Sequence, residues 1–178
     1  MLFVAQIIGL LAVATFLISY QQKKRTNIIL FNVISRCLYI FQYLLLGAFA
    51  GAVLDILGAV ASVVAGKKHT PFIKKHLPWV ILSVNALIVA AGVTIAVINQ
   101  SWLDLFSLMG VLLHTGAFWL SSEKIIRRIS LAGSPFWFIY NFMSGAYGSA
   151  IGDLLTMASI LLAMYRHRDK GDTKTENN

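Results

Sequence analysis

Residues 47–55 read Gly-Ala-Phe-Ala-Gly-Ala-Val-Leu-Asp, and residues 145–153 read Gly-Ala-Tyr-Gly-Ser-Ala-Ile-Gly-Asp. The two stretches align at a constant offset of 98 residues, which places glycine on glycine at the start and aspartate on aspartate at the end. In each, small residues that suit a turn join two apolar runs, and a lone carboxylate follows a turn later. This repetition predicts a chain built twice from one structural unit.

The composition places these hairpins in a membrane. The 178 residues are 58% hydrophobic and only 12% charged, whereas about 25% of residues are charged in a typical soluble domain. A membrane-spanning helix needs about 20 apolar residues, so the chain has the length for about seven spans. The single cysteine, Cys37, excludes an intrachain disulfide and is interpreted as an apolar filler within a span.

The apolar runs predict an all-α membrane protein with seven transmembrane helices. The expected spans are residues 2–20, 28–47, 51–66, 78–98 and 102–120, followed by two spans within 129–165 that divide at 145–149. Positive charge follows the first run and does not precede it, so we interpret that run as a retained helix and not as a signal peptide.

The basic residues alternate between the connections. Of the 15 lysines and arginines, all except Arg36 lie in the connections 1–2, 3–4 and 5–6 or in the C-terminal tail. Seven spans bring all of these segments to one face, which the positive-inside rule identifies as cytoplasmic. We therefore expect the N-terminus outside and the C-terminus in the cytoplasm, and we interpret the net charge of +8 as a topology signal and not as a nucleic-acid footprint.

Spans 2 and 3 match spans 6 and 7 at the offset of 98 residues, and span 4 has no counterpart. The expected arrangement is therefore 3+1+3, with two parallel triple-helix repeats about an axis along the membrane normal. The corresponding segments are residues 1–66 for repeat 1, 67–100 for the basic loop and linker helix, 101–165 for repeat 2, and 166–178 for a polar cytoplasmic tail.

Residues 137–148 carry a family resemblance and read Trp-Phe-Ile-Tyr-Asn-Phe-Met-Ser-Gly-Ala-Tyr-Gly. With the chain length, the basic loops and the 3+1+3 pattern, this run resembles the YgjV-like bacterial inner-membrane proteins, which are related to the SWEET/PQ-loop transporters. The resemblance covers nearly the whole chain. It implies a SWEET-like fold in the bacterial inner membrane and a transport-like role, and it supplies no substrate.

Arg36 is the sharpest signal for a functional site, because a charged side chain in the middle of a span is costly and needs a cavity or a partner. Three interpretations remain open. The guanidinium forms an ion pair with Asp55, Asp104 or Asp153, or it binds a solute, or it extends to the cytoplasmic surface.

Further polar and aromatic side chains are expected around Arg36. Asn32, Arg36 and Tyr43 lie near one helical face, and Trp137 and Asn141 are similarly placed in the second repeat. At the offset of 98, Tyr43 matches Asn141. These two faces either enclose a central polar solute or form interhelical packing and hydrogen bonds.

His114, deep in span 5, is either a solute-binding or proton-linked group or a neutral histidine bonded to a neighbouring helix. Asp55, Asp104 and Asp153 are candidates for gating or ion pairing, and for Asp55 and Asp153 a role in stabilising helix N-termini is the alternative. Pro135 is a candidate hinge, with a fixed bend as the alternative.

These residues favour a membrane facilitator or uniporter for a small polar or anionic solute that works by alternating access between the two repeats. The alternative is a non-transporting membrane scaffold or receptor subunit with the same fold. We expect no enzyme activity, because Ala150-Ile151-Gly152-Asp153 lacks the first glycine of the Gly-x-Gly-Asp motif of intramembrane aspartyl proteases. We expect no catalytic residue, metal, cofactor or nucleic-acid partner, with the lipid bilayer and the solute as partners and self-association left open.

Overall fold

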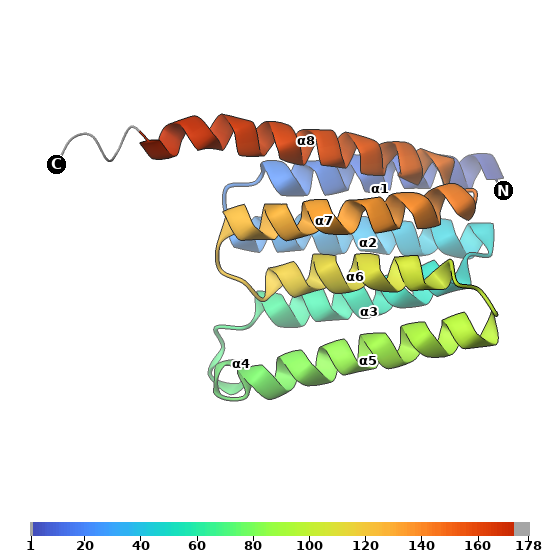
Figure 1. The fold of residues 1–178 in the computed structure, drawn as a ribbon, viewed down its shortest axis with the longest axis horizontal. Coiled ribbons are helices and arrows are strands. Elements are labelled where there is room, and N and C mark those ends of the chain that lie inside the picture. Colours follow the sequence, from blue (N-terminus) through green and yellow to red (C-terminus); the bar gives the residue numbers. More distant parts are fainter. Residues whose placement is uncertain (1, 173–178) are drawn as a thin grey trace.

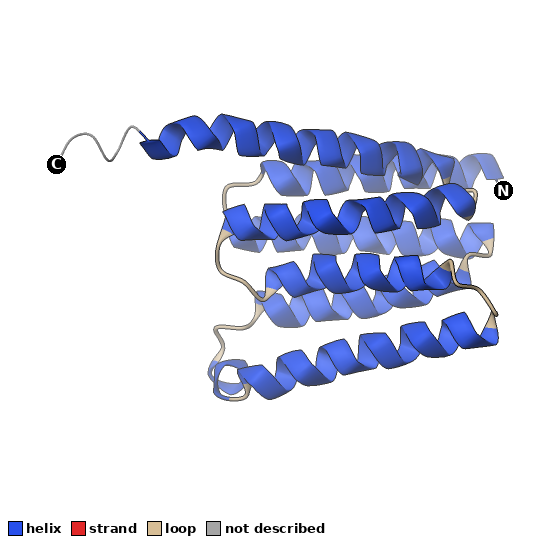
Figure 2. Cartoon of the chain, in the orientation of Figure 1, coloured by secondary structure: helices blue, strands red, loops and turns tan. Residues whose placement is uncertain are grey.

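The computed structural model describes residues 2–172, apart from the side chains of Glu123, Ala163 and residues 166–172. The described chain consists of helices and short connections (Figure 2). The helices are α1 (Leu2–Gln21), α2 (Arg25–Leu46), α3 (Phe49–Gly66), α4 (Pro71–Lys75), α5 (Leu77–Ile98), α6 (Asp104–Phe118), α7 (Glu123–Met143) and α8 (Tyr147–Asp172).

Six of the long helices form two layers (Figure 1). One layer holds α1, α2 and α3, and the other holds α8, α7 and α6, with the middle helix of each layer packed on both of its neighbours. The layers join where α1 packs on α8 and where α3 packs on α6, so the six helices close into a ring. Helix α5 lies outside the ring against α3 and α6.

The connections divide between the two ends of the bundle (Figure 1). The links α1–α2, α3–α5 and α6–α7 lie at one end, and the links α2–α3, α5–α6 and α7–α8 lie at the other. Apart from Arg36 and those of the C-terminal segment, the lysines and arginines lie in the first group of links or within the first six residues of the helix that follows a link. This end is called the basic end below, and the second group of links carries no lysine or arginine. The separation of the two kinds of connection that the sequence predicts is therefore confirmed.

Both small-residue hairpins turn through a left-handed glycine. Gly47 has a φ of 72° and Gly145 a φ of 76°, a conformation that glycine adopts without a Cβ penalty. After each glycine, an alanine N–H donates to a carbonyl five residues back, at 2.9 Å in both hairpins (Ala48 to Tyr43 and Ala146 to Asn141). The two stretches that align in sequence therefore form the same helix ending.

The surface and length of the helices suit a bilayer. Four of them, α1, α2, α3 and α5, are long and apolar enough to cross a membrane, and Asp104–Phe118 and Tyr147–Leu162 are shorter apolar helical segments. The exposed side chains on the outside of the bundle include large apolar residues such as Phe41, Val60 and Leu87. An extended apolar surface of this kind indicates contact with lipid.

The structure differs from the sequence prediction at three places. Helix α7 begins at Glu123, six residues before the predicted start of its span at 129. The basic loop contains the short helix α4, which was expected to be irregular. The last helix extends to Asp172, seven residues beyond the predicted end of the span at Tyr165, and thereby includes part of the predicted tail. The remaining predicted tail, residues 173–178, lies outside the described residues.

Candidate functional site

A small cavity lies at the centre of the ring, with a volume of about 20 Å³. That is enough space for one water molecule. Every helix of the ring contributes to its wall. The lining residues are Phe16 from α1, Arg36, Tyr39 and Tyr43 from α2, Asp55 from α3, His114 from α6, Trp137 and Asn141 from α7, and Asp153 from α8.

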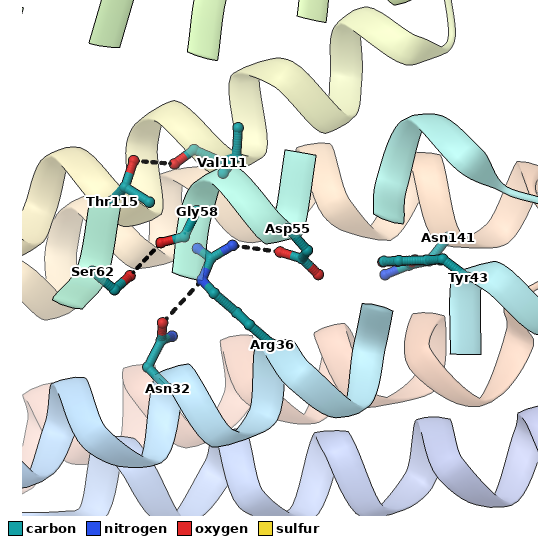
Figure 3. Close-up of polar contacts among 9 residues, drawn as sticks. All are labelled: Asn32, Arg36, Tyr43, Asp55, Gly58, Ser62, Val111, Thr115 and Asn141. Atoms are coloured by element: carbon teal, nitrogen blue, oxygen red, sulfur yellow. Dashed lines mark hydrogen bonds and ion pairs between the residues drawn. The ribbon is translucent and has the colours of Figure 1, made fainter. Parts of the chain in front are cut away.

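Arg36 is held by two side chains from the first layer (Figure 3). Its Nη1 forms an ion pair and hydrogen bond with Oδ1 of Asp55, and its Nε donates to Oδ1 of Asn32 at 3.0 Å. The side chains of Arg36 and Asp55 are only 4% and 3% exposed. Among the three interpretations of Arg36, the ion pair with Asp55 is therefore present, and extension to the cytoplasmic surface is wrong.

Gly58 makes room for the guanidinium. A Cβ at this position would lie 2.3 Å from Nη1 of Arg36 and 2.8 Å from a methyl carbon of Val111. The hydroxyl groups nearby point elsewhere, because Ser62 donates to the Gly58 carbonyl and Thr115 donates to the Val111 carbonyl within their own helices (Figure 3). Asp55 and Asn32 therefore hold Arg36, in a space that a methyl group at position 58 would fill.

A second set of polar contacts connects the layers. The Tyr43 hydroxyl donates to Oδ1 of Asn141 at 2.7 Å, and Nδ2 of Asn141 donates to Oδ2 of Asp153 at 2.8 Å. Tyr43 and Asn141 are buried, and Asp153 is 6% exposed. These two hydrogen bonds connect α2 to α7 and α7 to α8, so they join the two halves of the molecule at the cavity.

Aromatic rings form the remaining wall. Tyr43 stacks on Tyr39 and on Trp137, with ring centroids 6.2 Å apart in both pairs. The His114 ring meets Phe16 edge-on at 5.7 Å, and its Nε2 lies 3.0 Å from the Ser130 carbonyl oxygen on α7. Of the two interpretations of His114, the hydrogen bond to a neighbouring helix is therefore present.

Two more hydrogen bonds cross between the layers. The Ser149 hydroxyl donates to Oε1 of Gln42 at 2.5 Å, and the Gly51 N–H donates to the Tyr140 hydroxyl at 2.8 Å. Sequence reasoning missed all four residues. The signal was present, because Gln42 matches Tyr140 and Gly51 matches Ser149 at the offset of 98.

The basic end is closed by cations bound to carbonyl oxygens. Arg25 donates to the carbonyl oxygens of Ala65 and Leu120 at 2.9 and 3.3 Å, and also to that of Phe118. Lys68 donates to the Trp119 carbonyl at 2.8 Å and to a serine hydroxyl at 2.9 Å. These contacts tie the first layer to the C-terminal end of α6, where the helix dipole favours positive charge.

The surroundings of Lys68 change the pKa of its ammonium group. Desolvation lowers the pKa of Lys68, and the nearby charge of Arg25 lowers it further. Sequence reasoning treated both residues only as topology signals and did not anticipate their contacts with the end of α6.

A groove of about 440 Å³ opens at the opposite end of the bundle. Asp104 lines it and accepts a hydrogen bond from Asn99 at 2.8 Å, so the interpretation that Asp104 pairs with Arg36 is wrong. Tyr140 also lines this groove, and its ring lies 6.0 Å from the rings of Tyr43 and Trp137 at the cavity. Tyr140 therefore stands between the groove and the central cavity.

The other predicted site residues have defined places. Five of the six predicted solute-binding residues line the cavity, and the sixth, Asn32, binds Arg36.

A helix-terminus role for Asp55 and Asp153 is wrong, because neither α3 nor α8 has an acidic residue in its first turn. Pro135 is exposed within the continuous helix α7, and its role as a hinge stays a prediction. Sequence reasoning did not single out Phe16, which lines the cavity.

Among the residues that the structure describes, no group of three or more histidine, cysteine, aspartate or glutamate side chains is placed to hold a metal ion. The arrangement of the site suits hydrogen bonding and stacking, since it combines amides, hydroxyls and aromatic faces around one ion pair.

Taken together, the apolar exterior, the alternating helices and the polar centre define a helical protein that crosses a membrane more than once. The chain belongs to the Imp-YgjV family of bacterial inner membrane proteins, whose family model matches residues 3–170. It is therefore a multi-pass protein of the bacterial inner membrane. No curated protein and no solved structure matches the chain.

Proposed function

We propose that this protein is a facilitator that passes a small polar solute across the inner membrane between its two halves. The observation that carries the proposal is the central cavity, to which all six helices of the ring contribute a side chain. Polar sites at the interface of two repeats, near the middle of the bilayer, are typical of transporters built from internal repeats.

Contacts between equivalent residues support the 3+1+3 arrangement of seven spans. Tyr43 and Asn141, which match at the offset of 98, bind each other. Gln42 in the first half binds Ser149 in the second half. Their equivalents, Tyr140 in the second half and Gly51 in the first half, also bind each other. A two-fold axis produces this pattern, because a residue on the axis meets its own equivalent and every other contact occurs twice.

The two ends of the bundle support alternating access with the basic end in the cytoplasm. Arg25 and Lys68 close the basic end, and the groove lies at the other end, separated from the cavity by Tyr140. In this proposal the structure is closed toward the cytoplasm, with its N-terminus outside. Solute enters from the groove when Tyr140 moves and leaves when the contacts to the end of α6 separate.

The charges around the cavity indicate whether the solute is neutral or anionic. The positive charge of Arg36 is already compensated by Asp55. The aromatic rings and amides that remain suit a neutral polar solute by stacking and by hydrogen bonding. Binding of an anion requires Arg36 to exchange Asp55 for the solute, so the charge balance favours a neutral polar solute over an anionic one.

The second candidate function is a membrane scaffold or receptor subunit that transports nothing. It is favoured by two observations: the central cavity holds no more than one water molecule, and Arg36 is bound to an aspartate. In this alternative the polar centre serves only to specify how the helices pack.

Solute-dependent thermal stability of the purified protein separates the two functions, because a ligand that binds the folded state stabilises it. We expect a small polar solute from a panel of sugars, nucleosides, vitamins, amino acids and organic acids to raise the unfolding temperature. Trp137→Phe should weaken this binding about tenfold, which corresponds to about 1.4 kcal/mol. The control is Trp79→Phe, since Trp79 is 70% exposed on α5.

Flux of the same solute into proteoliposomes then tests passage. Flux that is reduced by Trp137→Phe and retained by Trp79→Phe supports the facilitator. A panel without any stabilising solute, or binding without flux, favours the scaffold.

The closure at the basic end makes a separate prediction. Lys68→Met removes the charged donor of two hydrogen bonds and should destabilise the protein by about 1.5–3 kcal/mol, the range for hydrogen bonds to charged groups. Lys67→Met is the matched control, because Lys67 is the preceding residue and is exposed. Thermal unfolding in detergent should show a lower midpoint for Lys68→Met only. Equal midpoints would show that Lys68 does not hold this end closed.

A further inference from the structure

The two halves differ in the charge that accompanies their aspartate. At the offset of 98, Asp55 matches Asp153, and Arg36 matches Ser134. The Ser134 hydroxyl donates to the Ser130 carbonyl within its own helix at 3.0 Å. The first half therefore holds a carboxylate with its cation, and the second half holds a carboxyl group with a serine in place of the cation.

Near the cavity, Asp153 faces six groups that carry charge or titrate, besides the hydrogen-bond donors Asn141 and Trp137. They are Tyr20 on α1, Arg36, Tyr39 and Tyr43 on α2, Asp55 on α3 and His114 on α6. The arginine in this set is already bound to Asp55 and Asn32, and within residues 2–165 no hydrogen bond or ion pair joins it to Asp153. Nε2 of His114 is directed to the Ser130 carbonyl.

An ionised carboxylate without a cation is costly in such a place. Removing an ion from water costs several kcal/mol in a protein interior, and the cost falls when the group becomes neutral. Asp153 is 6% exposed and accepts one hydrogen bond from Asn141, an uncharged partner. A proton on its other oxygen removes the charge and provides a donor toward the cavity, which has room for one water molecule.

We propose that Asp153 is a proton-binding site of the central cavity, and that passage of solute is linked to loading and release of this proton. One proton from the bulk solution reaches a carboxylate oxygen of Asp153 by way of the cavity water, which stays neutral, and the step leaves the neutral acid. Release returns the proton to water and leaves the anion beside the Arg36–Asp55 pair. The linkage to solute rests on the proposed function, whereas the proton on Asp153 does not depend on it.

Infrared spectroscopy of the purified protein in liposomes at neutral pH tests the site. We expect a carbonyl stretch of a protonated carboxylic acid that shifts in D₂O, is lost in Asp153→Asn and is retained in Asp104→Asn. Asparagine keeps an oxygen that accepts from Asn141, so the folded structure should survive the change. Asp104 is a matched control, because it is also 6% exposed but lies in the groove.

A spectrum without this band, or a band that remains in Asp153→Asn, overturns the proposal. If Asp153→Asn does not fold, raising the pH of the wild-type protein is the second measurement. The band should then disappear while the folded state persists, and a band that stays until unfolding contradicts an exchangeable proton. Failure of either measurement leaves the solute-binding result with Trp137→Phe standing, so the two proposals fail separately.

Discussion

Arg36→Met is expected to destabilise the protein by about 3–5 kcal/mol, the range for removing one partner of a buried ion pair. The substitution leaves the carboxylate of Asp55 buried and without its charged donor. Arg36→Met with Asp55→Leu should recover most of the loss, because replacing both members of a buried pair by apolar groups is often close to neutral. The measurement is thermal and denaturant unfolding in detergent.

The control for this experiment is Arg128→Met, which removes an exposed arginine near the start of α7. It should change the unfolding midpoint little, since exposed ion pairs contribute about 0–1 kcal/mol. If the double variant is as unstable as the single one, the cost does not come from an unpaired Asp55. The double variant also separates the two functions, because it should fold and yet bind solute poorly if the polar centre is the site.

Gly58→Ala is the second large effect that we expect. The added methyl group would meet Nη1 of Arg36 at 2.3 Å and a methyl of Val111 at 2.8 Å, so the guanidinium has to move away from Asp55. Overpacking of a core alone costs about 1–3 kcal/mol. Weakening of the ion pair adds to this cost, and the loss should exceed the gain of about 1 kcal/mol that alanine brings over glycine in a helix.

Gly66→Ala in the same helix is the matched control. Its Cβ would meet a methyl of Ile29 at 3.5 Å, which is an ordinary contact. Unfolding midpoints should therefore fall for Gly58→Ala and stay level or rise for Gly66→Ala. If both variants behave alike, the space at Gly58 does not control the position of Arg36.

Much of the fold could be predicted from the sequence because membrane helices follow simple signals. Apolar runs, small-residue hairpins and the alternation of basic connections each depend on local composition. Helix α4 was missed because its five residues, Pro-Phe-Ile-Lys-Lys, are too few for any apolar period. The last helix was ended too early, since hydropathy reports where lipid ends and not where the backbone stops being helical.

The candidate site could be predicted in part, and the offset of 98 residues is the reason. It paired Tyr43 with Asn141 before any contact was known. The partner of Arg36 could not be predicted, because three aspartates were available and the choice depends on how each helix is rotated about its axis. Phe16 gave no signal, since one aromatic residue in an apolar span looks like any other.

The most direct test of the account is the accessibility of position 39 to water. In a Cys37→Ser background, Tyr39→Cys lies at the cavity, where Tyr39 is 8% exposed, and Phe41→Cys lies two residues away on the outer face, where Phe41 is 61% exposed. Labelling uses a membrane-impermeant thiol reagent, applied to right-side-out and to inverted vesicles. We predict that Tyr39→Cys reacts from both sides and Phe41→Cys from neither. A Tyr39→Cys variant that reacts from neither side, while the protein is folded, would contradict a centre that opens in turn to each face of the membrane.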